Sequence, residues 1–218
     1  MLRLGPTGGE PVRRVLAIGA HSDDLEIGCG GTLLALCRAE PQVSVHWVVL
    51  AAPGERADEA RASASAVLAG VEDQTVEVHS LTDGYLPHTA AEVKDVFEKL
   101  KERVEPELVL THTRDDLHQD HRLVCELTWN TFRDHLILEY EIPKWDGDVG
   151  RPNVYVPLTE ELVRDKLAIL SAHFDSQSDK HWFDADLFRG LMRIRGMECR
   201  APSGFAEAFF GRKLALEL

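Results

Sequence analysis

Two short polar segments carry most of the residues that could do chemistry. The first spans residues 21–24 (HSDD) and the second spans residues 118–121 (HQDH). Imidazole and carboxylate groups are the ligands of catalytic zinc, which keeps one coordination position for water. Either segment alone is more typical of a helix N-cap or a solvated loop. Because two such segments occur, and each follows a predicted strand, we favour a metal site that activates water.

The spacing within the segments suggests which residues would bind the metal. His21 and Asp24 are three residues apart, so a loop or a first helical turn can direct both toward one ion. His121 completes a set of two imidazoles and one carboxylate, which suits Zn²⁺ but also Fe²⁺ or another divalent ion.

The remaining residues of the two segments fit acid–base roles. Asp23 stays free to take a proton from water as the general base, after which the hydroxide attacks an amide carbonyl. His118 would stabilise the resulting intermediate or protonate the leaving amine. Asp120 could orient a histidine by hydrogen bonding. These roles describe the hydrolysis of an amide.

Strand and helix patterns alternate along the chain and would position both segments. We predict strands at residues 15–20, 43–52, 75–81, 108–113 and near 154–156, and helices at 32–40, 55–70, 90–106, 122–135 and about 159–172. Residues 195–210 read as a loop followed by an edge element. This alternation predicts an α/β fold, a Rossmann-like three-layer sandwich with a mostly parallel sheet. Both segments then lie at the carboxyl ends of strands, where such sheets bind ligands.

Composition narrows the cellular setting. The 218 residues are 44% hydrophobic and 28% charged, which is typical of a globular chain, and we expect one domain over residues 1–218 with a loose arm at 1–11. The net charge of -13 disfavours a nucleic-acid partner. The chain has neither a signal-peptide core nor the roughly 18 apolar residues of a membrane span. Four cysteines without a C-x-x-C pair are compatible with a cytoplasmic location.

Three glycines at positions 28, 30 and 31 invite a dinucleotide-binding interpretation, and with it a nicotinamide-dependent oxidoreductase. The G-x-G-x-x-G fingerprint is absent, and acidic residues stand where a pyrophosphate would need helix amides. Close packing of a helix on the sheet explains the glycines better. Cys29 lies among them and has no activating base nearby, so we expect a buried thiol.

Longer motifs around the two segments resemble the LmbE-like, or PIG-L, family of N-acetylglucosaminyl deacetylases. The family pattern A-H-P-D-D-E-x-x-G-C-G-G-T is similar to AHSDDLEIGCGGT, and the pattern D-x-H-x-D-H is similar to DDLHQDHR, which begins at residue 115. Weaker similarities in RADEA, LTDGYLP, FDSQ and FAEAF extend the resemblance over nearly the whole chain.

The resemblance implies a zinc-dependent deacetylase with His21, Asp24 and His121 as zinc ligands and Asp23 as general base. It further implies that His118 stabilises the tetrahedral intermediate and that Asp120 tunes it.

Arg56 matches a substrate-contacting arginine of the family, although an exposed arginine paired with Glu55 or Glu59 is an equally good interpretation. Two departures from the family pattern stand out. Ser22 replaces the usual proline, and Leu25 stands where many members have glutamate, with Glu26 following it. Neither removes a group that the mechanism needs.

Three functions remain open at this stage. The first is removal of acetyl from a small N-acetylglucosamine-type substrate, and the second is an amidase of the same mechanism that cleaves a larger acyl group. The third is a non-catalytic sugar- or nucleotide-binding protein, which the presence of a complete base and acid disfavours. A homo-oligomer is expected by analogy with the family.

Overall fold

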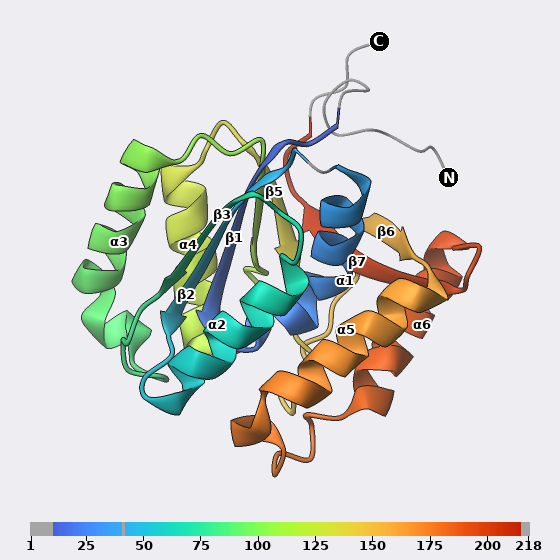
Figure 1. Cartoon of the computed structure of the whole chain (residues 1–218). Helices are drawn as coiled ribbons and strands as arrows, with labels where there is room; N and C mark the ends of the chain where they lie inside the picture. The colour runs from blue at the N-terminus through green and yellow to red at the C-terminus, as the bar shows by residue number, and fades with distance from the viewer. Residues whose placement is uncertain (1–10, 41, 215–218) are drawn as a thin grey trace.

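The computed structural model describes residues 11–40 and 42–214. The strands in these residues form one seven-stranded sheet (Figure 1). The strands are β1 (Arg14–His21), β2 (Ser44–Ala51), β3 (Asp73–Val78), β4 (Leu108–His112), β5 (Leu136–Tyr140), β6 (Val154–Leu158) and β7 (Phe205–Gly211). Their order is β3-β2-β1-β4-β5-β7-β6. Strands β1 to β5 are parallel, whereas β7 is antiparallel to both of its neighbours. The arm that we expect at residues 1–11 falls, apart from Pro11, outside the described residues.

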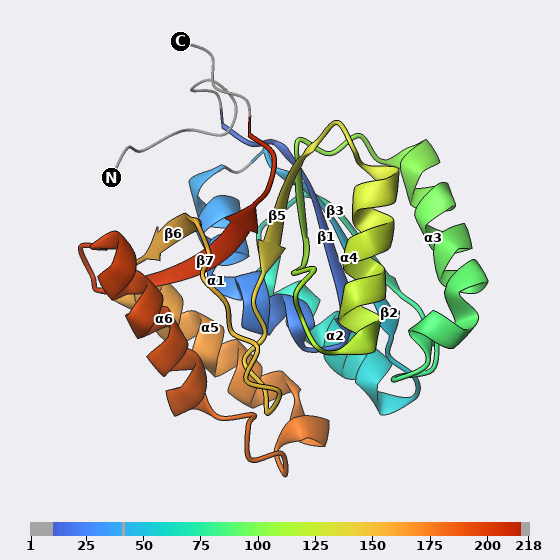
Figure 2. The same cartoon turned by 180° about the vertical axis from the view of Figure 1, so that it is seen from behind.

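Helices cover both faces of the sheet (Figures 1 and 2). One face carries α1 (Asp24–Ala39), α2 (Glu55–Val67), α5 (Glu160–His173) and α6 (Ala185–Cys199), and the other carries α3 (Ala90–Arg103) and α4 (Gln119–Thr131). The predicted Rossmann-like three-layer sandwich is therefore confirmed. Among residues 11–40 and 42–214, none of the helices has the length and apolarity that a membrane crossing requires.

Strand β1 explains why the sheet has a core on each side. All of its residues after Arg14 are buried. Val15 and Ala17 belong to the core under α1, α2 and α5, while Leu16 and Ile18 belong to the core under α3 and α4. A strand that is buried on both faces reads as a continuous apolar run, and this is why the sequence pattern was easy to recognise.

The glycines of α1 allow the helix to lie very close to the sheet. A Cβ at Gly28 would meet the ring of Tyr140 on β5 at 2.2 Å, and one at Gly31 would meet Leu158 at 2.6 Å and Glu207 at 3.0 Å. Close helix–strand packing, which the sequence favoured over a dinucleotide-binding loop, is what these glycines provide.

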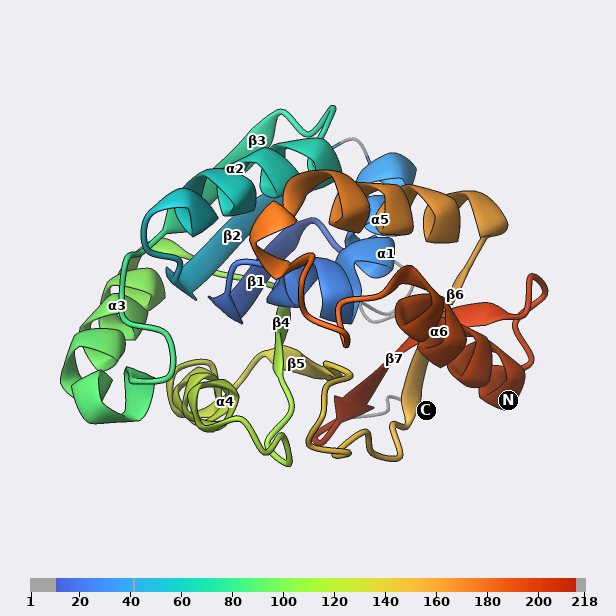
Figure 3. The same cartoon turned by 90° about the horizontal axis from the view of Figure 1, so that it is seen from below.

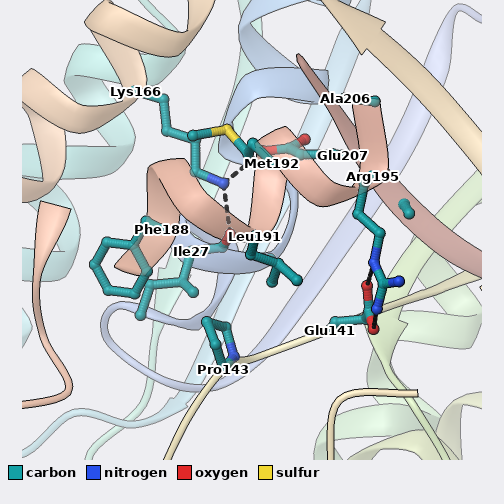
Figure 4. A pocket seen from close by; sticks show the side chains of 12 residues that line it. Ile27, Glu141, Pro143, Lys166, Phe188, Leu191, Met192, Arg195, Ala206 and Glu207 are labelled. Atoms are coloured by element: carbon teal, nitrogen blue, oxygen red, sulfur yellow. Dashed lines mark hydrogen bonds and ion pairs between the residues drawn. The ribbon is translucent and has the colours of Figure 1, made fainter. Parts of the chain in front are cut away.

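A buried ion pair contacts the backbone of α1 (Figure 4). Lys166 Nζ on α5 donates to the Ile27 carbonyl at 2.6 Å and to Glu207 Oε1 on β7 at 2.7 Å. The carboxylate of Glu207 accepts from the amides of Gly31 and Thr32 at 2.8 and 2.7 Å. The ion pair thus contacts the Gly31 amide and the Ile27 carbonyl, two groups that are hydrogen-bond partners in a regular helix.

Three expectations about the elements were wrong. Helix α1 begins at Asp24 rather than at residue 32. The sequence does not reveal this start, because the first turns are buried on all sides and so show no helical alternation of polar and apolar residues. Residues 195–199 belong to α6 rather than to a loop. The last strand, β7, lies between β5 and β6 and is not an edge. Strand β5 was not predicted at all; it has only five residues and contains the buried Glu139.

Candidate active site

The two polar segments meet at the carboxyl-terminal edge of the sheet, which faces the viewer in Figure 3. His21 ends β1 and Asp24 begins α1, while His118 is the N-cap of α4 and His121 lies in its first turn. Strands β1 and β4 are neighbouring parallel strands, so the loops that follow them lie side by side. Asp24 is a first-turn carboxylate, a favourable position next to the amide end of a helix.

The three expected metal ligands converge on one point. His21 Nδ1 lies 3.1 Å from His121 Nε2 and 3.4 Å from Asp24 Oδ2. Asp24 Oδ1 lies 3.5 Å from His121 Nε2. All three side chains are buried. These atoms are close enough together for one cation to contact all of them, and the donor set is one that zinc or Fe²⁺ accepts.

Carboxylates contact the opposite nitrogen of each ring. His121 Nδ1 lies 2.9 Å from Asp116 Oδ2, and His21 Nε2 lies 3.1 Å from both Asp120 Oδ2 and Asp83 Oδ1. A ring nitrogen that donates to a carboxylate leaves the other nitrogen with its lone pair free for a metal. The surroundings of both histidines therefore suit metal binding, with the inner nitrogens toward Asp24.

The electrostatic environment favours the metal-binding forms of His121 and Asp24, whereas it favours the protonated form of His21. Burial lowers the pKa of His121 to about 3, and the neighbouring His112 adds to this effect. Burial opposes the charged form of Asp24, but the surrounding histidines hold its pKa well below the ordinary value. Burial also opposes charge on His21, yet Asp24 and Asp120 raise its pKa well above the usual range. His121 is thus a neutral imidazole and Asp24 a carboxylate, the forms in which they bind metals.

His112, at the end of β4, is a site residue that the sequence analysis missed. Its fully buried ring stacks on His121 with centroids 3.8 Å apart, and its Nε2 lies 3.1 Å from Asp24 Oδ2. The Ala20 amide donates to the same nitrogen at 3.0 Å. Among the described residues, three groups have donor atoms close enough together to hold a metal: Asp24, His112 and His121; His21, His118 and His121; and His21, Asp83 and Asp120. The available signal was a histidine at the carboxyl end of a fully buried strand, directly after Thr111.

Arg56 lies at the site beside the expected base. Its guanidinium contacts Asp23 Oδ1 at 3.6 Å, donates to Ser22 Oγ at 3.1 Å and to Asp83 Oδ2 at 2.6 Å. It therefore does not behave as the exposed arginine of the competing interpretation. Asp23 is buried; burial and the adjacent Asp24 raise its pKa, while Arg56 opposes the shift.

His118 and Asp120 both lie at the site, and the carboxylate of Asp120 hydrogen-bonds to groups other than His118. The Asp120 amide donates to His118 Nδ1 at 3.3 Å, whereas its carboxylate contacts His21 and accepts from the amides of Gly84 and Leu86 at 2.7 and 3.2 Å. His118 is only partly buried; burial and the nearby His21 lower its pKa. His118 is therefore the more accessible of the site histidines.

The two departures from the family pattern have different positions. Ser22 is buried at the site and accepts the hydrogen bond from Arg56, a contact that proline could not make. Leu25 is fully buried in the core, and Glu26 is buried against the hydroxyl of Ser63 on α2. The second departure therefore changes the contact between α1 and α2 rather than the cluster around Asp24.

The family model described as GlcNAc-PI de-N-acetylase (PIG-L) matches residues 16–132, which include both polar segments. The chain is also similar to YaiS, an uncharacterized deacetylase of Escherichia coli K12. The two are 30% identical over 170 residues, which cover 73% of this chain and 89% of YaiS.

Two solved structures are similar in fold. The N,N'-diacetylchitobiose deacetylase of Pyrococcus horikoshii superposes with a TM-score of 0.68 and 20% identity, covering 91% of this chain and 83% of that one. GalB, the 4-carboxy-2-hydroxymuconate hydratase of Pseudomonas putida KT2440, superposes with a TM-score of 0.73 and 18% identity, covering 94% and 98%. Since a deacetylase and a hydratase share this fold, function must be argued from the site.

Proposed function

The chain belongs to the PIG-L family, the GlcNAc-PI de-N-acetylases, and on that premise we propose that it is a metal-dependent hydrolase that removes acetyl from a small N-acetylglucosamine-type substrate. The observation that carries the proposal is the convergence of His21, Asp24 and His121 within 3.5 Å of one another. Zinc as the metal and the cytoplasm as the location are parts of this proposal.

The donor set and its surroundings support a divalent cation held by His21, Asp24 and His121. When bound, such a cation acts as a Lewis acid that makes water nucleophilic near neutral pH and stabilises negative charge on a carbonyl oxygen. Asp116 contacts Nδ1 of His121, the ring nitrogen that faces away from Asp24. Asp83 and Asp120 contact the corresponding nitrogen of His21, Nε2. Fe²⁺ or another divalent ion fits the same set of ligands.

The remaining side chains supply proton transfer and substrate contact. Asp23 is adjacent to a metal ligand but is not one of the three converging groups, so it is free to take a proton from the attacking water. His118, partly accessible and beside His21, stabilises the tetrahedral intermediate and protonates the leaving amine. Arg56 reaches the site from α2 and contacts the sugar.

The proposal is tested by measuring amine release from a panel of N-acetylated sugars, with and without a chelator. We expect turnover that the chelator abolishes and added zinc restores. Asp23→Ala should keep its metal, measured by elemental analysis, and lose most turnover, while Asp73→Ala at an exposed position of β3 should behave as the parent protein. Full activity of Asp23→Ala, or turnover indifferent to chelator, would overturn the mechanism. Faster release of a longer acyl group than of acetyl would favour the amidase alternative.

A further inference from the structure

Two hydrogen bonds set the orientation of the Arg56 guanidinium. Its Nε donates to Ser22 Oγ at 3.1 Å, and its Nη1 donates to Asp83 Oδ2 at 2.6 Å. The third nitrogen, Nη2, lies 3.6 Å from Asp23 Oδ1, which is longer than a hydrogen bond. Because the guanidinium is planar and rigid, bonds from two of its nitrogens fix its plane as well as its position.

The place of Arg56 on its helix makes these two bonds necessary. Arg56 is the second residue of α2, close to the amide end, where the helix dipole disfavours a cation. Its side chain is nevertheless largely covered, with 17% of its surface exposed. A long side chain that is held in this way loses rotamer freedom, which costs free energy. The bonds to Ser22 and Asp83 offset this cost and keep the guanidinium at the site.

Ser22 is the uncharged member of this pair of anchors. It lies in the turn between β1 and α1, beside Asp23, and it is fully buried. A hydroxyl can hold Nε without adding a further negative charge next to Asp23 and Asp24. Proline, which the family pattern has at this position, offers no side-chain acceptor. The anchor at Nε therefore depends on the residue by which this chain departs from the family pattern.

We propose that Ser22 is a positioning residue that fixes the Arg56 guanidinium in the orientation in which its terminal nitrogens meet the substrate. A guanidinium has five N–H groups, and the bonds to Ser22 and Asp83 use two of them, so Nη1 and Nη2 can still donate to oxygens of the substrate. This inference rests on the proposed deacetylase function for the substrate contact, whereas the orientation of the side chain can be measured without turnover.

Ser22→Ala tests the substrate contact, because it removes a single oxygen atom. One hydrogen bond changes an equilibrium about 2- to 10-fold, so KM for N-acetylglucosamine should rise by about that factor while kcat stays within about twofold. In an Arg56→Lys background, which lacks the Nε–H donor, Ser22→Ala should not change KM further. Ser176→Ala is the matched control: it removes a hydroxyl that donates to Glu59 of the same helix at 2.6 Å, and it should leave KM unchanged.

The orientation of Arg56 is measured separately, by NMR of protein made with isotope-labelled arginine. The side-chain Nε–H signal that Arg56→Lys removes is the signal of Arg56. A hydrogen bond protects an N–H group from exchange with water. Below neutral pH this signal should therefore exchange at least about tenfold faster in Ser22→Ala than in the parent protein or in Ser176→Ala. Equal exchange in Ser22→Ala and the parent overturns the inference, whether or not any sugar is deacetylated.

The two measurements separate failure of the inference from failure of the proposed function. Faster exchange in Ser22→Ala, with no turnover of any N-acetylated sugar by the parent protein, supports the orientation by Ser22 and refutes the deacetylase. Turnover by the parent protein with an unchanged KM in Ser22→Ala overturns the role of Ser22 and leaves the deacetylase intact. A fall in kcat at unchanged KM also overturns it, because the loss then lies at the reacting groups rather than in the contact with the substrate.

Discussion

Replacing Gly28 by alanine should destabilise the protein, although alanine is the better helix former. The new methyl group would lie 2.2, 2.6 and 3.0 Å from three ring atoms of Tyr140. That ring is fully buried, its hydroxyl donates to the Ile18 carbonyl at 2.7 Å, and its centroid lies 4.8 Å from that of His112. Either α1 or the ring must therefore move.

The size of the effect follows from these contacts. Overpacking a tight core costs about 1–3 kcal/mol, and weakening the Tyr140 hydrogen bond adds about 1 kcal/mol. Alanine regains about 0.5–1 kcal/mol of helix stability relative to glycine. We therefore expect Gly28→Ala to lower the free energy of unfolding by about 2–3 kcal/mol, and the melting temperature by about 4–12 °C for a chain of this length.

Gly30→Ala is the matched control on the same helix. Its Cβ would meet no atom closer than 3.8 Å, so the helix preference alone should act and stabilise the protein by about 0.5–1 kcal/mol. Urea unfolding followed by circular dichroism measures both variants. If Gly28→Ala is as stable as the parent, or if the free energies of unfolding of the two variants change in the same direction, the reasoning is refuted. The close approach of Tyr140 to α1 would then not determine the effect of a side chain at position 28.

Three further predictions concern single side chains. Asp116→Asn should weaken metal binding about 10- to 100-fold by removing the carboxylate behind His121; competition with a chelating dye measures it, and an unchanged affinity would contradict the site. Lys166→Met should lower the free energy of unfolding by about 3–5 kcal/mol because it leaves Glu207 buried without its cation, and adding Glu207→Gln should restore part of that loss; equal urea midpoints for single and double variants would argue against the ion pair. Burial raises the pKa of Cys37 to about 11, so at about pH 8 its reaction with iodoacetamide should be at least about 100-fold slower than that of free cysteine; comparable rates by peptide mass spectrometry would refute this.

The parts that were predictable from sequence depend on local patterns. Strand β1 is a continuous apolar run, and its polar continuation at His21 marks the carboxyl edge of the sheet. Because β4 pairs with β1, the segment containing His121 had to come near. The sequence predicted that both segments follow strands at the same edge of the sheet, whereas the pairing of β4 with β1 is a finding of the structure.

The parts that were missed depend on contacts between distant positions. Asp83 and Lys144 are single charged residues in loops, and only the folded chain brings them to His21 and Asp116. The interior position of β7 depends on pairing with both β5 and β6, and an alternating pattern cannot specify its neighbours. His112 was missed because it falls inside the predicted strand 108–113. As the last residue of β4 it is both a strand residue and a neighbour of Asp24.

The contact between Glu207 and the amides of α1 has a consequence for how the chain reaches its native state. The helix that begins at Asp24 depends on a carboxylate 176 positions later than its partner Gly31. During synthesis, α1 leaves the ribosome long before β7 exists, so its contact with Glu207 forms only after β7 has been made. Chains that end before β7 therefore lack this contact at the helix whose first residue, Asp24, belongs to the candidate active site.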